Sequence, residues 1–172
     1  MSPAADSSEP SAADRLAQLF DRHHARLYKL ARRMVRTSDA ARDVVQDTFL
    51  RAARSPRSIP DGPAHEEAWL VRILVNICRD GWRKESVRRR LANSVPAETE
   101  ILAPESALIA RSTVWRALDA LPPRRRAVIV LYEIEGTAIS TIAGLLGISS
   151  VTVRWHLSVG RRELARFMGS LT

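Results

Sequence analysis

Hydrophobic positions recur at intervals of three and four residues through most of this chain, which is the period of an amphipathic α-helix. The spacing predicts helices over residues 12–36, 39–53, 65–83, 108–121 and 124–134, and a further pair between residues 139 and 162. Ser11 and Asp14 are spaced as a capping pair before the first helix, and Thr37 breaks the pattern before the second. No segment alternates with a period of two for long, so the predicted fold class is all-α.

The hydrophobic period lapses between Glu85 and Pro104 and returns from Glu105. The intervening segment is first basic and then mildly acidic, which is typical of a flexible linker between domains. The sequence therefore predicts two small helical domains joined by a linker. The predicted divisions are a disordered N-terminus over residues 1–11, a helical domain over 12–85, a linker over 86–104 and a second domain over 105–172.

The last predicted pair of helices has the spacing of a helix-turn-helix. Ile142, Leu145 and Leu146 form an apolar stripe, and Gly147 stands where the first helix must turn, because glycine adopts positive φ without steric cost. Ser149 or the serine after it can cap the next helix by accepting free backbone N–H groups. An ordinary helical hairpin in a core would show the same stripe. The basic exposed face of the second helix favours DNA binding over that alternative.

The overall charge points in the same direction. The chain has 27 Lys and Arg against 19 Asp and Glu, a formal net charge of +8 at pH 7, which favours a polyanionic partner such as nucleic acid. Nearly all of the basic residues are arginines, which suits contacts with phosphates and bases, although a GC-rich genome would produce the same bias.

Other functional classes find little support. The four histidines, at positions 23, 24, 65 and 156, lack metal-ligand spacing, and the chain has neither a glycine-rich phosphate loop nor a nucleophile paired with a base. We therefore expect no catalytic residue, no metal and no cofactor. The single cysteine, Cys78, lies in an apolar run and is expected to be a buried structural thiol in a reducing compartment. No apolar run approaches the roughly 18 residues that span a membrane, so a soluble, cytoplasmic protein without membrane insertion is expected.

The second predicted helix displays a polar face. Asp43, Gln46, Asp47 and Arg51 are spaced at i, i+3, i+4 and i+8, so they project from the same side. A solvated helix face would show this pattern, and so would a surface that docks a basic helical partner. The spacing alone leaves both possibilities open.

Three motifs in order give the chain a resemblance to a known family. The first consists of the acidic and amide residues of the second helix, Asp43, Gln46 and Asp47, together with Phe49. The second is the pattern A-W-L-x-x-I-x-x-N-x-x-x-D-x-x-R over Ala68–Arg83. The third is L-P-x-x-x-R-x-V over Leu121–Val128, before the helix-turn-helix. Together they resemble the two domains of bacterial extracytoplasmic-function (ECF) sigma factors of RNA polymerase. The resemblance extends from about Leu16 to Phe167.

The resemblance implies a subunit that binds core RNA polymerase, directs it to specific promoters and helps to melt the minus-ten element. In that family the second helix binds the clamp helices of the largest polymerase subunit, and the polymerase flap is a second contact. The implied core-polymerase-binding residues are Asp43, Gln46, Asp47 and Arg51. The linker of such proteins threads the active-site cleft of the polymerase. A separate anti-sigma factor that occludes both domains is also implied.

In the first domain, the third helix of the family opens the minus-ten element and holds a flipped base near an asparagine. The implied minus-ten residues are Arg72, Asn76, Arg79, Asp80, Arg83 and Lys84. A basic track with donors for an unstacked base is what strand opening requires. Trp82 can either stack on a base or pack in the core.

In the second domain, the recognition helix of the family enters the major groove of the minus-thirty-five element. The implied residues are Arg124, Arg126, Ser149, Ser150, Thr152, Arg154, Trp155, Ser158, Arg161 and Arg162. Arg154 suits a bidentate contact with guanine, whereas the arginines at 124, 126, 161 and 162 suit phosphates. Trp155 stands where small residues are common in the family, and Val159 where a basic residue is frequent. The promoter consensus of the family is therefore not transferred to this chain.

A stand-alone regulator of the LuxR type is the alternative function, because its recognition helix is similar to Thr152–Leu157. Such regulators carry a sensor domain in front of the helix-turn-helix. Nothing in residues 12–83 looks like a ligand pocket or a phosphoacceptor sheet, and the polar face of the second helix would have no explanation.

Overall fold

The computed structural model describes residues 11–91 and 109–169, and every regular element in these two ranges is helical, which confirms the all-α prediction. The elements are α1 (Ala12–Met34), α2 (Ser38–Ala53), η1 (Pro56–Ser58), α3 (Pro63–Leu91), α4 (Ile109–Ala120), α5 (Pro123–Ile129), η2 (Val130–Ile134), α6 (Ile139–Leu146) and α7 (Ser150–Gly169). The predicted disordered N-terminus, apart from Ser11, and most of the predicted linker lie outside the described residues.

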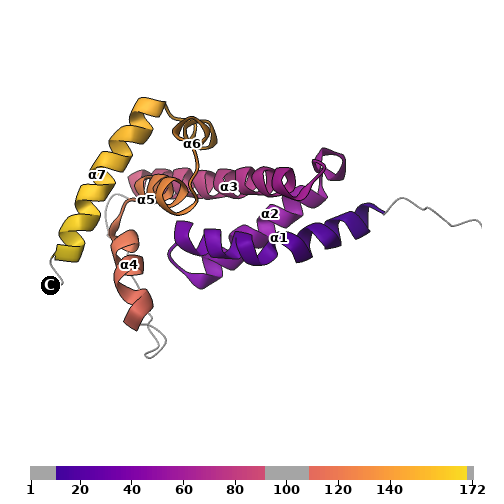
Figure 1. Cartoon of the computed structure of the whole chain (residues 1–172), viewed down its shortest axis with the longest axis horizontal. Helices are drawn as coiled ribbons and strands as arrows, with labels where there is room; N and C mark the ends of the chain where they lie inside the picture. Colours follow the sequence, from indigo (N-terminus) through magenta and orange to yellow (C-terminus); the bar gives the residue numbers. More distant parts are fainter. Residues whose placement is uncertain (1–10, 92–108, 170–172) are drawn as a thin grey trace, which may run out of the picture.

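The helices form two groups that lie against each other. α1 and α2 pack side by side, and α3 packs on both of them. In the second group, α7 packs against α4, α5 and α6. Figure 1 shows α3 running across the molecule, with α5 and α6 near one of its ends and α7 at the outer edge. The second group therefore leaves one side of α7 turned away from the rest of the protein.

The predicted caps fix where the first two helices begin. The Asp14 backbone N–H donates to Ser11 Oγ at 3.1 Å, and the Ser11 N–H donates to Asp14 Oδ2 at 3.1 Å, which completes a capping box. Thr37 Oγ1 accepts from the backbone N–H of Ala40 at 3.1 Å at the start of α2. Both predicted cap sites are confirmed.

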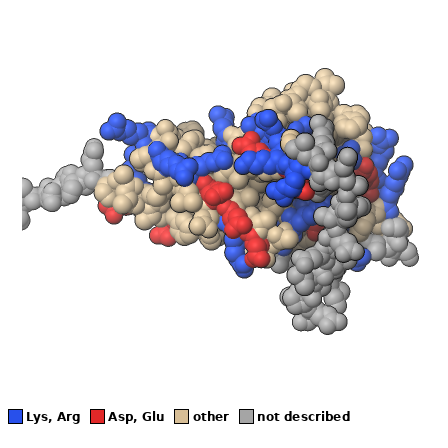
Figure 2. Space-filling view, turned by 180° about the vertical axis from the view of Figure 1, so that it is seen from behind, with Lys and Arg blue, Asp and Glu red and all other residues tan. Residues whose placement is uncertain are grey.

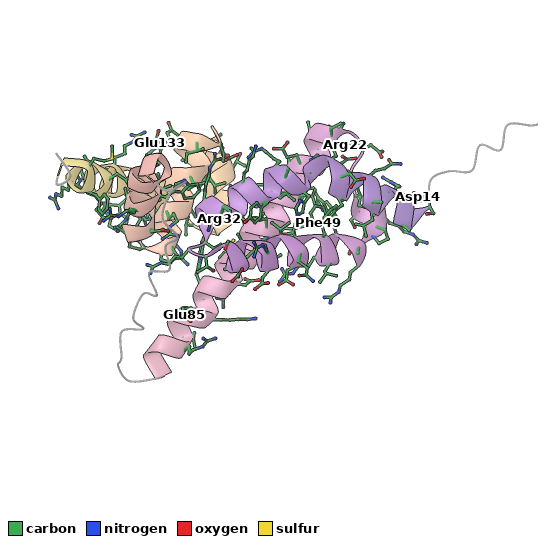
Figure 3. All side chains as sticks on the ribbon, turned by 90° about the horizontal axis from the view of Figure 1, so that it is seen from below. Asp14, Arg22, Arg32, Phe49, Glu85 and Glu133 are labelled. Carbon is green, nitrogen blue, oxygen red and sulfur yellow. The ribbon has the colours of Figure 1, made fainter. Side chains whose placement is uncertain are left out.

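α3 is longer than its hydrophobic period predicts. The helix was expected to end at Arg83, but it continues to Leu91 and enters the predicted linker. The segment from Lys84 onward contains neither proline nor glycine and is rich in Lys, Glu and Arg, which are good helix formers. Val87 and Leu91 are the only apolar residues of this segment, too few to set up a hydrophobic period. Figure 3 shows this end of α3, marked by Glu85, projecting away from the other helices.

The predicted helix over residues 124–134 is divided into two forms. α5 ends at Ile129 and continues as a π-helical turn, η2. Every residue from Arg126 to Leu131 is buried, so this part of the chain is covered on all sides rather than along a single stripe.

Cys78 is a buried structural thiol, as predicted. Its side chain is part of the core shared by α1, α2 and α3. Burial away from water disfavours the thiolate and raises the pKa of Cys78 to about 12. The thiol therefore stays protonated and unreactive in the folded protein.

A carboxylate from the second group joins the two groups of helices. Glu135 lies in the turn between η2 and α6, and its side chain is only 7% exposed. Arg33 Nη1 donates to Glu135 Oε1 at 2.8 Å, and Arg26 Nη2 donates to the other oxygen. Both arginines belong to α1, and the hydrogen bond to Glu135 is the main cause that raises the pKa of Arg26. The contact of α1 with the second group therefore includes an ion pair whose carboxylate is buried. It also includes Arg32, whose guanidinium lies 5.8 Å from the centroid of the Trp115 ring.

A partly buried carboxylate within the first group, Glu66, makes the stability of the fold depend on pH. Glu66 Oε2 accepts from Arg22 at 2.6 Å and lies 2.9 Å from Nε2 of the buried His23. Burial raises the pKa of Glu66, but the hydrogen bonds from His23 and Arg22 together outweigh it, so the net pKa is lowered.

We expect Glu66→Gln to lose about 1 kcal/mol of stability near neutral pH, since the charge-assisted bonds become neutral ones. The pKa of Glu66 is lower in the folded protein than in the unfolded chain. The ionised carboxylate therefore stabilises the fold at pH values above the ordinary glutamate pKa of about 4.3. That contribution disappears as the pH falls through the lower folded value, so the two proteins should converge in acid. Thermal unfolding from pH 7 to pH 3 measures this, with Glu67→Gln as the control, because Glu67 is 38% exposed and pairs with Arg26 at 3.2 Å. A constant difference across this range would contradict the prediction.

Candidate nucleic-acid and protein interfaces

The polar face predicted on α2 is present at the surface. Asp43, Gln46, Asp47 and Arg51 are all exposed, while Ala41, Val45, Thr48, Phe49 and Ala52 turn inward. The Thr48 hydroxyl donates to the backbone carbonyl of Val44 at 2.7 Å, so this inward polar group is satisfied. The face therefore presents two carboxylates, an amide and a guanidinium from a rigid element.

The α2 face also has an apolar centre that sequence analysis missed. Leu50 is 49% exposed and lies on the same stripe, three residues after Asp47. Phe20 of α1 is 43% exposed, and its ring centroid lies 4.8 Å from that of Phe49. Figure 3 shows Phe49 between α1 and α2. The spacing of Leu50 from Asp43 and Asp47 was the signal that could have revealed it.

The predicted minus-ten residues share one side of α3. Arg72, Asn76, Arg79 and Arg83 follow one another at i, i+4, i+7 and i+11, with Lys84 and Asp80 beside them. The flanking positions Arg72, Arg83 and Lys84 are exposed, whereas Asn76, Arg79 and Asp80 are partly buried. Trp82 is partly buried and packs against the core, and stacking of its exposed part on a base stays a prediction.

Arg79 is partly covered by the second group of helices. Its Nη1 lies 3.3 Å from the point where a Cβ would stand at Gly147, the turn of the helix-turn-helix. Its Nε lies 3.9 Å from Asp80 Oδ1, beyond hydrogen-bond distance. In this arrangement the centre of the α3 stripe therefore faces α6 and its turn rather than solvent.

The helix-turn-helix has the local geometry that the sequence predicts. Gly147 ends α6 with φ 63° and ψ 43°, in the left-handed region. Ser149 Oγ accepts from the Thr152 backbone N–H at 3.1 Å and caps α7. Ile142 is fully buried, as predicted, and Leu145 and Leu146 are 8% and 2% exposed. α7 crosses α5 so closely that a Cβ added at Gly160 would meet Ile129 Cγ1 at 2.9 Å.

The predicted recognition residues lie on three sides of α7. Trp155, Ser158 and Arg162 face outward, opposite the buried Val153 and Leu157. Arg154 and Arg161 lie on one flank, where they help to line a shallow hollow of about 320 Å³ with Tyr132 and Ile139. Arg161 Nε also donates to Glu133 at 2.7 Å.

The other flank of α7 faces α5. Arg125 Nη1 donates to both oxygens of Glu163, and its guanidinium lies 5.5 Å from the centroid of the Trp155 ring. Burial, and then the charges of Arg125 and Arg124, lower the pKa of the adjacent His156, which favours the neutral ring. Sequence analysis did not anticipate this arrangement.

The burial of Arg126 contradicts the expectation that this residue contacts phosphate. Its side chain is 2% exposed, and it is committed to the end of α4. Nε donates to the Leu118 carbonyl at 2.8 Å, Nη2 donates to the Asp119 carbonyl at 3.0 Å, and Nη1 pairs with the Asp119 carboxylate at 3.1 Å. Desolvation lowers its pKa, and the Asp119 charge opposes this effect. By contrast, Arg124 is exposed, and phosphate contact by that residue remains a prediction.

The charged side chains are unevenly distributed over the surface. Figure 2 shows a narrow band of acidic side chains across the middle of one face, with basic side chains on both sides of it. Within the described ranges, no three His, Cys, Asp or Glu side chains gather as a metal-binding group. No single helix there is long and apolar enough to cross a membrane, although α6 and α7 together meet the length and composition criteria as a pair bent by 102°.

Comparison with known proteins assigns each group of helices to a protein family. The Sigma-70 region 2 family matches residues 19–88, and the Sigma-70 region 4 family matches residues 111–164. The ECF RNA polymerase sigma factor SigM of Mycobacterium tuberculosis is 37% identical over 164 residues, which cover 93% of this chain and 81% of SigM. The RNA polymerase sigma factor CarQ of Myxococcus xanthus is 31% identical over 166 residues, covering 93% of this chain and 92% of CarQ.

Two solved structures share the arrangement of the helices. The Bartonella quintana sigma factor RpoE, in complex with the anti-sigma factor NepR, superposes with a TM-score of 0.69 at 25% identity over 91% of this chain and 97% of RpoE. CnrH, in complex with the cytosolic domain of CnrY, gives a TM-score of 0.58 at 28% identity over 91% of this chain and 89% of CnrH. With two sigma-70 regions in order and relatives of this similarity along nearly its whole length, the chain belongs to the ECF family of RNA polymerase sigma factors.

Proposed function

We propose that this protein binds core RNA polymerase through α2, melts the minus-ten element with α3 and reads the minus-thirty-five element with α7. Family membership establishes promoter-specific initiation of transcription as its function. A LuxR-type regulator is not favoured, because residues 19–88 match Sigma-70 region 2. Catalysis would belong to the polymerase, and the site of action would be the cytoplasm, where core polymerase meets the chromosome.

The α2 face supports the polymerase contact. Asp43 and Asp47 supply negative charge around the exposed Leu50, which suits a partner helix with basic side chains flanking an apolar one. Because these side chains come from a packed helix, their positions are set before the partner arrives.

The α3 stripe supports strand opening. Arg72, Arg83 and Lys84 can follow a phosphate backbone, and Asn76 offers both a donor and an acceptor to an unstacked base. The stripe can do this only after the two groups of helices separate. The minus-ten and minus-thirty-five elements are about 25 base pairs apart, or about 85 Å at about 3.4 Å per base pair. In the structure the two groups of helices lie against each other, which we call the closed arrangement. In this arrangement Arg79 of α3 lies against the turn at Gly147.

An anti-sigma factor is the further partner that we propose. RpoE, a structural relative of this chain, was solved in complex with the anti-sigma factor NepR, and CnrH was solved in complex with the cytosolic domain of CnrY. A protein that holds the closed arrangement would keep the α3 stripe and α7 from reaching both promoter elements together.

Run-off transcription from genomic fragments tests the proposal. Core polymerase with this protein should produce transcripts from discrete start sites that core polymerase alone does not produce. The double variant Asp43→Arg, Asp47→Arg should lower the affinity for core polymerase about tenfold or more, because like charges would meet the basic partner. The matched control is Asp61→Arg, since Asp61 is fully exposed in the loop before α3. Absence of selective transcripts with the wild-type protein would refute the function, whereas full activity of the double variant would refute only the assignment to α2.

A further inference from the structure

The outward face of α7 carries two large apolar side chains near its N-terminal end. Trp155 is 53% exposed, and Val151, one turn earlier, is 72% exposed. Both lie opposite the stripe formed by Val153 and Leu157, which is buried in the core. A helix face that met only water would place polar groups at these positions. The pair therefore indicates a partner that is apolar at the point of contact.

The indole of Trp155 is held in position by neighbouring side chains of α5 and α7. The Arg125 guanidinium lies 5.5 Å from the centroid of its ring, within the range of a cation–π interaction. Arg125 is itself fixed by two hydrogen bonds to Glu163, at 2.5 and 2.6 Å. The His156 ring meets the indole edge-on, with 4.9 Å between centroids. A side chain that is fixed in this way loses little conformational entropy on binding.

The surroundings of the apolar pair identify the class of partner. Arg154, Arg161 and Arg162 are exposed on the same helix, and Arg124 is exposed on α5. A polyanionic duplex complements this charge. In the major groove, the apolar group that a base pair offers is the C5-methyl group of thymine.

We propose that Trp155 and Val151 recognise thymine methyl groups in the minus-thirty-five element, and that Arg125 is a positioning residue for the indole. This inference rests on the proposed function of α7. Polar and basic residues around the pair would hold the duplex, and the apolar pair would select thymine at one or two base pairs. Recognition would then depend on a methyl group rather than on a hydrogen bond at those positions.

Replacement of single thymines by deoxyuridine tests the inference, because this change removes only the methyl group and preserves base pairing. Once transcription has defined the promoter, each thymine of its minus-thirty-five element is replaced in turn in duplexes bound by the holoenzyme. We expect about fourfold weaker binding at one or two positions, the effect of one methyl group that is no longer buried. The Trp155→Ala holoenzyme should bind the two kinds of duplex equally, and Trp155→Phe should restore part of the difference.

Two further variants separate positioning from folding. Arg125→Met should reduce the thymine preference while core-polymerase binding remains unchanged and the second group of helices, which contains Arg125, stays folded at the assay temperature, as circular dichroism measures. Met168→Ala, at an apolar position 47% exposed near the end of α7, should keep the full preference.

Several results would overturn the inference. They are a minus-thirty-five element without thymine, wild-type binding that is indifferent to every deoxyuridine, and a thymine preference that survives Trp155→Ala. Loss of core-polymerase affinity in Trp155→Ala without DNA would instead make the pair a protein-docking surface. In each case selective transcription would continue with the wild-type protein, so failure of this inference is distinct from failure of the proposed function.

Discussion

Replacing Arg126 with methionine should unfold the helix-turn-helix domain at a markedly lower temperature than in the wild type. The substitution leaves the carbonyls of Leu118 and Asp119 without their donors at the end of α4, and it removes the partner of the Asp119 carboxylate. Hydrogen bonds from a charged group contribute about 1.5–3 kcal/mol each, so a loss of about 3 kcal/mol is expected. In a domain of this size, that loss corresponds to a fall of more than 10 °C in the melting temperature, which calorimetry can measure.

The neighbouring arginine provides the control for this experiment. Arg124 is exposed, and Arg124→Met should change stability by less than about 0.5 kcal/mol. If Arg124 contacts phosphate, its variant should bind all promoters more weakly and reduce the salt dependence of binding by about one unit of slope. A stable Arg126→Met protein with a selective defect in DNA binding would contradict the structural role assigned to Arg126.

The second large effect is expected at Glu135. Glu135→Lys removes the acceptor of Arg26 and Arg33 and places a third positive charge beside them. Glu135 is buried, but Arg26 and Arg33 are 40% and 29% exposed, so solvent screens the pair and its loss costs less than that of a fully buried pair. A cost of about 2 kcal/mol is expected, which lowers the ratio of closed to open protein about thirtyfold. The distance between dyes attached at positions 57 and 166, which are exposed in the first and second groups of helices, should increase in single-molecule energy transfer. Cys78 will not interfere with labelling, because it is buried and its pKa is about 12.

Glu133→Lys is the matched control, since it makes the same charge change two residues away. Glu133 pairs with Arg161 at 2.7 Å, within the second group of helices, so the distance between the dyes should stay at the wild-type value. Equal expansion of both variants would show that net charge, rather than the Glu135 ion pair, holds the protein closed.

The caps and turns that were predicted correctly from the sequence are decided by short-range signals. The caps at Ser11, Thr37 and Ser149 and the left-handed turn at Gly147 depend on residues within a few positions of each other. The polar stripe of α2 follows from helical spacing alone. These features are independent of what the rest of the chain does, so one sequence is enough to predict them.

The features that sequence analysis missed depend on contacts between distant segments. Arg124, Arg125 and Arg126 are identical in type, yet one is exposed, one supports Trp155 and one is buried. The three arginines differ only in the side of α5 from which they project. Arg126 lies on the same side as the buried residues Ile129 and Val130. Glu135 is over 100 positions from its partners, and no local pattern marks it.

The Glu135 ion pair also has a consequence for how the activity of this sigma factor could evolve. If only the open form binds a promoter, the apparent affinity equals the intrinsic affinity multiplied by the open fraction. A substitution at Arg26 or Arg33 that shifts this fraction tenfold, about 1.4 kcal/mol, would change transcription of every target gene in proportion. Selection could therefore raise or lower the whole regulon together through α1, while the residues that choose its member promoters stay the same.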